Sequence, residues 1–402
     1  MSKIEELINK YCPDGVNYFS INEIATTYNG LSGKNKDDFK NGNAKFITYM
    51  NVYKNASTDL SDTSVVRINE NEKQNNIKLG DILMTTSSEN IEDSGMISVV
   101  TKQPEENIYL NSFCFGIRIK DEYLSRFNFD YLKHLFRSKA IRKKIQKCSF
   151  GVTRFNLNKN KFLKIRIPVP PMEVQSEIVH ILDDFTLLTA KLTAELTARN
   201  KQYEYFKNKL LNIEHNQNVE VNEIGEICNI KAGGDKPKEF FSKIKNEEFN
   251  IPVIGNGIGK NAIIGYTNEA KISQKAVTIA ARGTIGYDEY RDYSYFPIIR
   301  LISAIPKDEK ILNTKYLYYC LKGRKYQTPK TGIPQLTVPI FSKTKILVPP
   351  LKKQERIVNT LDRFDKLTND INEGLPAEIE ARKKQYEYYR DKLLNFKELK
   401  EA

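Results

Sequence analysis

Two stretches of this chain carry many basic residues and no acidic residue. Nine lysines and arginines lie between Ile141 and Arg166, and six lie between Leu321 and Lys345. A solvated charged surface normally mixes both signs, whereas an acid-free run is suited to contacts with phosphate groups. We therefore interpret both runs as candidate nucleic-acid contacts, with an ordinary charged surface as the alternative. The lysines singled out in the two runs are Lys143, Lys144, Lys147, Lys161, Lys325, Lys330 and Lys343.

Each basic run also contains a turn that begins with glycine, at residues 151–157 and 332–338. Arginine can form paired hydrogen bonds with guanine, and asparagine or glutamine can do so with adenine. Alternatively, such side chains cap the backbone groups of a structural turn, and the sequence leaves both interpretations open. The candidate base-reading side chains in these turns are Arg154, Asn156, Gln335 and Thr337.

The chain lacks the motifs of several catalytic classes. Residues 255–261 resemble a phosphate-binding loop but lack its glycine spacing and the Ser or Thr that would follow Lys260. Neither Pro-Pro pair has the Asn or Asp that amino-methyltransferases place before it to hold their target amine. Three histidines and five well-separated cysteines make a zinc site or a hydrolytic triad unexpected. We therefore expect no catalytic residue, no metal site and no cofactor bound by this chain.

Composition limits the class of protein further. A chain of 402 residues is long enough for two or three domains. Its net charge of +13 favours a polyanionic partner, which would be nucleic acid or an anionic membrane surface. The N-terminus is polar and no stretch approaches 18 consecutive apolar residues, so we expect a soluble, cytoplasmic protein that does not enter a membrane.

The chain contains an internal repeat in which a globular block is followed by a helical element. The segments that begin at Pro170 and Pro349 match through Phe185 and Phe364 at an offset of 179 residues. The expected domains are a recognition block at 1–169, a helical spacer at 170–215, a second block at 216–348 and a second spacer at 349–402.

Apolar residues recur every three or four positions in both spacers, which predicts helices that pack on each other as an antiparallel pair. Gly374 and Pro376 predict a break between helices at 351–368 and 377–396, whereas the first copy has no such proline and can continue as one helix. The residues expected in the helix pair or in partner docking are Tyr203, Phe206, Leu210, Tyr386, Tyr389 and Leu393.

The two blocks show alternating, strand-like runs separated by polar turns. We therefore expect an α+β fold with two mixed α/β domains in a pseudo-twofold repeat, separated by two long helices that form an antiparallel coiled-coil pair. The expected strands are 45–52, 81–86, 96–100 and 112–119 in the first block and 252–254, 276–280, 296–302 and 345–348 in the second.

Taken together, these features resemble the DNA specificity subunit of type I restriction–modification systems. The most specific marks are the repeated tyrosine-rich helix at 375–390 and the motifs at 46–52, 151–157, 281–286 and 332–337. The motif at 281–286 adds Arg282 and Thr284 to the candidate DNA contacts.

The resemblance implies two target-recognition domains that each read one half of a split double-stranded DNA target. The helices would act as a spacer that sets the gap and docks two modification (methyltransferase) subunits, which restriction (translocase/nuclease) subunits would join. S-adenosylmethionine, ATP and Mg²⁺ would then belong to those partner subunits. Outside this family, the alternatives are a non-catalytic scaffold that binds nucleic acid or protein, and a nuclease with an unrecognised site.

Overall fold

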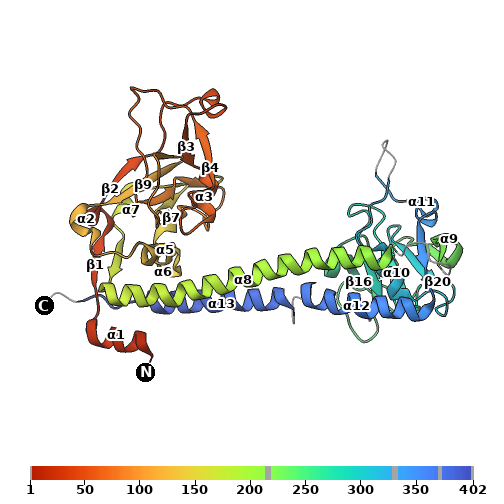
Figure 1. Cartoon of the computed structure of the whole chain (residues 1–402). Coiled ribbons are helices and arrows are strands. Elements are labelled where there is room, and N and C mark those ends of the chain that lie inside the picture. The colour runs from red at the N-terminus through yellow and green to blue at the C-terminus, as the bar shows by residue number, and fades with distance from the viewer. Residues whose placement is uncertain (1, 213–218, 328–333, 370–373, 400–402) are drawn as a thin grey trace. The chain divides into compact units, whose positions relative to one another are not determined.

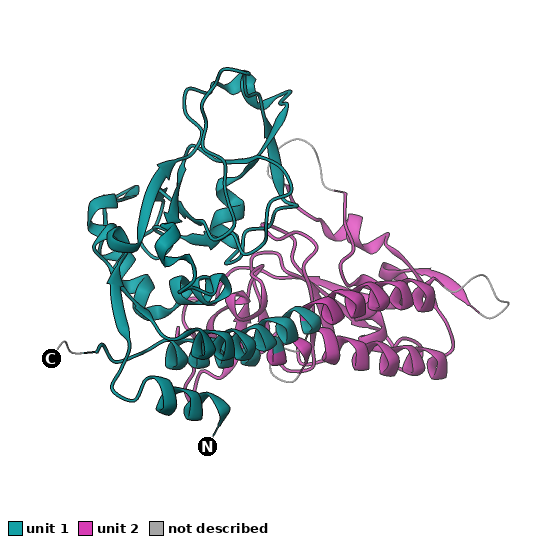
Figure 2. Cartoon of the chain, turned by 60° about the vertical axis from the view of Figure 1, so that its left-hand side comes forward, with its two compact units in different colours: residues 1–192, 379–402 teal, residues 193–378 magenta. Residues whose placement is uncertain are grey.

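The computed structural model describes residues 2–212, 219–327, 334–369 and 374–399. The chain divides into two compact units (Figure 2). Unit 1 contains residues 1–192 and 379–402, and unit 2 contains residues 193–378. The last helix of the chain therefore contributes most of its length to unit 1, although it follows unit 2 in the sequence.

A four-stranded antiparallel sheet forms the centre of unit 1 (Figure 1). Its order is β2 (Ala25–Asn29), β9 (Cys114–Ile119), β5 (Ile82–Thr85) and β7 (Ile97–Val99). A second sheet has the order β4 (Thr63–Val66), β3 (Ala44–Ile47) and β8 (Ile108–Leu110), with β3 and β8 parallel. Two further antiparallel sets are β1 (Asn17–Ser20) with β12 (Arg166–Val169), and β10 (Ser149–Phe150), β11 (Phe155–Leu157) and β6 (Ser87–Ser88).

Unit 2 repeats three of these four strand sets, and the β10–β11–β6 set has no counterpart among its described residues. Its central sheet has the order β14 (Cys228–Ala232), β20 (Ile302–Pro306), β17 (Ala276–Ile279) and β18 (Asp288–Arg291). Its second sheet has the order β16 (Ile263–Thr267), β15 (Ile251–Ile254) and β19 (Phe296–Pro297), again with a parallel pair, β15 and β19. The strands β13 (Glu220–Glu223) and β21 (Lys345–Val348) pair as β1 and β12 do. The repeat expected from the sequence is therefore also a repeat of strand pairing.

Short helices connect these strands. Those of unit 1 are α1 (Lys3–Tyr11), α2 (Ile21–Ile24), α3 (Tyr49–Lys54), α4 (Asp121–Leu124), α5 (Phe129–Arg137), α6 (Lys139–Gln146) and α7 (Lys159–Leu163). Those of unit 2 are α9 (Ile224–Ile227), α10 (Thr314–Leu321) and α11 (Val338–Ser342).

The long helices are α8 (Met172–Leu211), α12 (Leu351–Asn369) and α13 (Leu375–Leu393). In unit 1, α13 packs antiparallel to the first half of α8 (Figure 1). The rings of Phe185 and Tyr389 stack with 5.3 Å between their centroids. In unit 2, the second half of α8 packs on α12, with Phe206 and Phe364 stacked at 5.8 Å. The first helical element is thus the single helix α8, and the second contains the two helices α12 and α13, as expected. Among the described residues, no helix is both long and apolar enough to cross a membrane.

A buried glutamine joins each block to its long helix. Gln175 is fully buried, accepts a hydrogen bond from the Asn128 backbone N–H (2.9 Å) and donates to the carbonyls of Arg126 (2.8 Å) and Pro170 (2.7 Å). Gln354, also fully buried, repeats these contacts in unit 2. It accepts from the Asn313 backbone N–H (2.9 Å) and donates to the carbonyls of Ile311 (2.8 Å) and Pro349 (2.8 Å). The glutamine thereby satisfies backbone groups where α5 or α10 begins and where the long helix begins.

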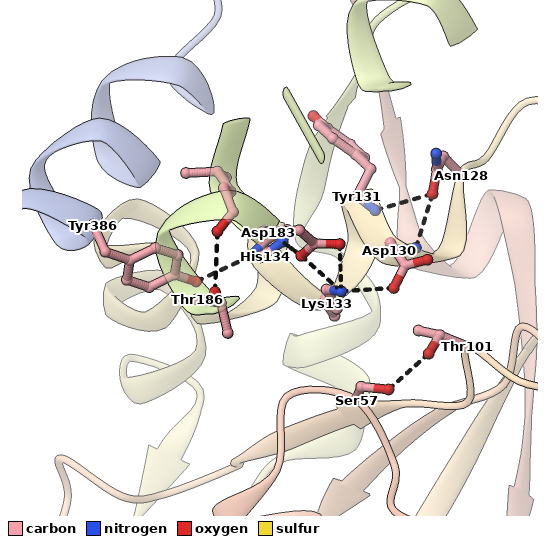
Figure 3. A network of polar contacts seen from close by, with 11 residues as sticks. Ser57, Thr101, Asn128, Asp130, Tyr131, Lys133, His134, Asp183, Thr186 and Tyr386 are labelled. Carbon is pink, nitrogen blue, oxygen red and sulfur yellow. Dashed lines mark hydrogen bonds and ion pairs between the residues drawn. The ribbon is translucent and has the colours of Figure 1, made fainter. Parts of the chain in front are cut away.

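A second junction uses an aspartate of the long helix but different partners in the two units. In unit 1, buried His134 lies between Asp183 (2.8 Å) and the hydroxyl of Tyr386 (3.0 Å), and Lys133 also contacts Asp183 (Figure 3). Burial lowers the pKa of His134, so its neutral ring donates to the carboxylate and accepts from Tyr386. In unit 2, the equivalent Asp362 also pairs with a lysine, Lys315 (2.7 Å), but accepts from Tyr319 (2.5 Å) where Asp183 bonds His134. The junction is thus repeated in position and varied in chemistry.

Two of the expected strands are wrong in part. The run 45–52 is a strand only to Ile47, because the Thr48 hydroxyl accepts from the Asn51 N–H and starts α3. The run 296–302 is interrupted by a turn in which Ile299 and Arg300 have positive φ.

The apolar stripe of α8 is less continuous than expected. Leu182 is fully buried, whereas Leu188 is 37% exposed, and no residue is buried between 186 and 202. In α13, Tyr386, Tyr389 and Leu393 do pack against the core of unit 1.

We predict that Gln175→Ala lowers the stability of unit 1. The substitution leaves buried backbone groups without partners, which costs about 1–3 kcal/mol of unfolding free energy. Chemical denaturation of the full chain measures the change. The matched control is Gln202→Ala, an exposed position on the same helix, which should change stability by no more than about 0.5 kcal/mol. Equal effects of the two substitutions would show that the buried hydrogen bonds do not hold the junction.

Candidate nucleic-acid interface

In unit 1, the loop before α7 is fixed against the segment that follows β5. The Leu157 N–H donates to the Thr86 carbonyl (2.9 Å), and Asn156 lies opposite Ser87 in the β11–β6 pairing. The Arg154 guanidinium donates to the Ser87 hydroxyl through Nε (3.2 Å) and Nη2 (2.9 Å). Two candidate base readers, Arg154 and Asn156, are therefore brought together around Ser87, a residue that no motif in the sequence indicates.

Unit 2 builds the same arrangement from different side chains. The Leu336 N–H donates to the Ala281 carbonyl (2.9 Å). This bond is equivalent to the one from the Leu157 N–H to the Thr86 carbonyl in unit 1. Gln335 precedes this leucine and accepts from the Arg282 guanidinium at 3.0 and 2.7 Å. By this backbone equivalence, Gln335 takes the place of Asn156, and Arg282 takes the place of Ser87. The side chains therefore differ between the two units, whereas the backbone hydrogen bond of the following leucine is the same in both.

The two candidate threonines differ in their contacts. The Thr284 hydroxyl donates to the Asn256 carbonyl (2.5 Å), so it stabilises the backbone of the loop. Thr337 precedes α11, and its side chain makes no capping hydrogen bond there. The alternative interpretation, that these polar residues hold a structural turn, therefore describes Thr284 better than Thr337.

We call the loop at 151–157, together with the segment at 86–88 to which it is bonded, the reading loop of unit 1; that of unit 2 is formed by 334–338 with 281–282. A surface cavity of about 690 Å³ lies beside the reading loop of unit 1. Tyr49 and Tyr53 line it with stacked rings 6.2 Å apart. Ser87, Asn90, Phe113 and Arg154 also line it. The cavity thus combines aromatic faces with hydrogen-bonding groups, a combination that suits nucleobases. No local pattern in the sequence indicates Asn90 or Phe113. Phe113 is found only when the two units are aligned by their strand pairing.

Most of the candidate lysines are available for phosphate. Lys143, Lys147, Lys161, Lys325 and Lys343 are exposed, and their ammonium groups make no hydrogen bond or ion pair with another described residue. Lys144 differs, because its ammonium group donates to the Arg166 carbonyl (3.0 Å) and burial lowers its pKa. Lys330 lies outside the described residues.

Other members of the basic runs hold the fold together. The Arg142 guanidinium donates to the carbonyls of Gly95 (2.6 Å), Ser94 (2.6 Å) and Glu92 (3.0 Å), and burial lowers its pKa to about 10. Lys322 forms an ion pair with Asp365 at 2.5 Å. An acid-free run in the sequence is therefore part structural and part exposed charge.

The six helix residues singled out from the sequence all contribute to packing within their units. Tyr203 is 4% exposed, and Leu210 packs against the same core. Exposed apolar side chains lie elsewhere on these helices, at Leu187, Tyr205 and Tyr388. Within the described residues, no group of three or more His, Cys, Asp or Glu side chains is placed to hold a metal ion.

The amino-acid sequence is similar to a known protein family and to individual curated proteins. A family model described as the type I restriction modification DNA specificity domain matches residues 13–199 and 216–381. A Mycoplasma pneumoniae chain assigned as a type I specificity subunit is 38% identical over 247 residues, which are 61% of this chain and 67% of that one. The EcoR124I/EcoR124II specificity subunit of Escherichia coli is 36% identical over 260 residues, 58% of this chain and 63% of that one.

Solved structures show the same fold. A chain from a structure of the type I R-M system, reported for its complex assembly and conformational transition, superposes with a TM-score of 0.60 at 16% identity. The superposition covers 95% of this chain and 98% of that one.

Arg142 and Lys143 are neighbours, but the structure assigns them different roles: Arg142 stabilises the fold and Lys143 is an exposed charge. We predict that Arg142→Ala destabilises unit 1 by about 1.5–3 kcal/mol, because it removes charged hydrogen bonds to three carbonyls. Lys143→Ala should leave stability within about 0.5 kcal/mol. Denaturant unfolding of both variants measures this, and a fully stable Arg142→Ala protein would contradict the structural assignment.

Proposed function

Because this chain belongs to the type I restriction–modification DNA specificity family, we propose that each of its two recognition blocks reads one half of a bipartite DNA target. The chain is a non-catalytic specificity subunit: it determines the DNA target of a type I complex and binds no cofactor itself. We assign residues 1–169 and 216–348 to the two readers, and residues 170–215 and 349–402 to the helical spacers.

The observation that carries this proposal is the repeated reading loop. The same backbone hydrogen bond, from Leu157 to Thr86 and from Leu336 to Ala281, supports different polar side chains in the two units. A repeated frame with varied side chains is what two readers of different base sequences require, because backbone contacts position a protein while base-edge contacts specify the sequence. Exposed lysines such as Lys143 and Lys325 would neutralise phosphates near each half-site.

The long helices would set the gap between the half-sites. α8 is unbroken for 40 residues and continues from residues of unit 1 into residues of unit 2. Half-sites read from one face of B-DNA are separated by multiples of about 34 Å, and an α-helix adds about 1.5 Å per residue. Changing the length of the helices should therefore change the gap in small steps.

Exposed helix surfaces would dock two modification subunits that bind S-adenosylmethionine and methylate adenine. Because Tyr203, Tyr386 and Tyr389 pack inside their own units, docking would use outward side chains such as Leu187 and Tyr388. Restriction subunits with ATP- and Mg²⁺-dependent activity would join the same complex.

We predict that Gln335→Ala and Lys143→Ala weaken DNA binding in different ways. Loss of a base-reading amide should relax one position of one half-site, at a cost of about 1–3 kcal/mol. Loss of an exposed lysine should weaken binding to all sequences and reduce the slope of log K against log salt by about 1. Binding of the assembled complex to a duplex library over a salt series measures both effects. If both variants lost affinity equally on every sequence, Gln335 would not be a base reader.

A helix insertion tests the spacer role. We expect four residues added within 188–196 of α8, about one helical turn, to lengthen the gap by roughly one to two base pairs while the half-sites stay the same. Mapping of methylated adenines in DNA modified by the variant complex reads out both quantities. Altered half-sites with an unchanged gap would rule out the spacer model, and an insertion within 367–378 is the matched variant for the second element.

A further inference from the structure

The turn between β19 and β20 has an unusual backbone. Ile299 (φ 54°) and Arg300 (φ 61°) are the non-glycine residues with positive φ among the described residues. This region is disfavoured for any side chain and especially for a β-branched one. Such a backbone persists only where surrounding contacts impose it, and it is enriched at ligand-contacting sites.

Specific hydrogen bonds impose this backbone. The N–H groups of Ile299 and Arg300 donate to the carbonyls of Gly234 (2.9 Å) and Gly233 (2.8 Å). The Asn256 side-chain amide donates to the Ile299 carbonyl (2.7 Å). Hydrogen bonds from two different segments therefore fix the backbone of the turn, and the Arg300 side chain is exposed to solvent.

Unit 1 contains the equivalent turn, at Asn111–Phe113. The Asn111 N–H donates to the last residue of β3, Ile47 (3.0 Å), as the Ile298 N–H donates to the last residue of β15, Ile254 (2.9 Å). Aligning the two units by this bond places Phe113 at the position of Arg300. Phe113 is 56% exposed, so its ring is accessible to a ligand.

Matching glycines confirm this alignment of the two turns. Gly30 donates to the Cys114 carbonyl (3.3 Å), and Gly233 donates to the Leu301 carbonyl (2.8 Å). A Cβ atom on Gly30 would lie 2.1 Å from the Asn111 carbonyl oxygen, and one on Gly233 would lie 2.6 Å from the Ile298 nitrogen. Both turns therefore require a glycine in the neighbouring strand end.

Each turn is linked by hydrogen bonds to the reading loop of its own unit, directly in unit 1 and through the Asn256 side chain in unit 2. In unit 2, the Asn256 side chain that holds the turn also accepts from the Ala281 N–H (2.8 Å), directly before Arg282. In unit 1, the Phe113 carbonyl accepts from the Thr86 N–H (3.0 Å), directly before Ser87, and Phe113 lines the cavity that Ser87 and Arg154 also line. Each turn thus displays one exposed side chain beside the loop that carries the candidate base readers.

We propose that Arg300 and Phe113 are equivalent base-contacting residues of the two units, a proposal that rests on the function proposed above. The Arg300 guanidinium makes no hydrogen bond or ion pair with any described residue, so its fork is available for O6 and N7 of guanine. The Arg282 fork is engaged by Gln335. The apolar ring of Phe113 suits the methyl group of thymine. The two units would therefore read this equivalent position by different chemistry.

The test maps methylation by the full chain assembled with its modification subunits, using S-adenosylmethionine and a library of randomised DNA duplexes. Arg300→Ala should reduce discrimination roughly 10- to 100-fold at one guanine-containing position of one half-site. Phe113→Ala should relax one position of the other half-site. Arg300→Gly removes the same guanidinium while glycine tolerates the positive φ; it should relax the same position as Arg300→Ala, and it separates loss of the contact from misfolding.

The matched control is Lys310→Ala, which removes an exposed charge beyond the opposite end of β20 and should relax no position. Retention of every base preference by both Arg300 variants, with an intact wild-type bipartite motif, would overturn this inference and leave the proposed function standing. Changes in both half-sites from one Arg300 variant would also overturn it. A wild-type complex with no bipartite motif would overturn the proposed function itself.

Discussion

The structure depends on the buried hydrogen bonds of two glutamines, Gln175 and Gln354. Each lies in the first turn of a long helix and satisfies backbone groups of the block beside it. Buried polar groups without partners are costly, so these bonds tie the start of α5 or α10 to the start of α8 or α12 in one arrangement. A reading loop can direct its side chains reproducibly only if its block is fixed to the helix in this way.

On this frame, equivalent backbone positions of the two units carry different outward-facing side chains. Asn156 and Gln335 occupy equivalent backbone positions, and so do Phe113 and Arg300. The hydrogen bonds that define these positions join main-chain groups, so they do not depend on the side chain. Such positions can change without disturbing the core, since surface substitutions away from core and caps have little effect on stability. Variation even reaches a half-buried junction, where Asp183 pairs with His134 and Asp362 pairs with Tyr319.

The sequence predicted what was repeated and periodic. The offset of 179 residues, the break at Gly374 and most strands of both blocks follow from local pattern and are present in the structure. Contacts between residues that are far apart in the sequence could not be predicted from local pattern. The Arg282–Gln335 pair joins residues 53 apart. Arg142 belongs to a run interpreted as phosphate contacts, although three carbonyls hold its guanidinium. The strand expected through Val52 failed because a single capping threonine, Thr48, outweighed the alternating pattern.

The central claim is that two independent readers share one repeated frame. The most direct measurement exchanges residues 216–348 for the corresponding block of a family member with a different known target and maps the methylated adenines. The account predicts that one half-site is replaced while the other half-site and the gap are retained. Replacement of both half-sites, or of neither, would contradict it.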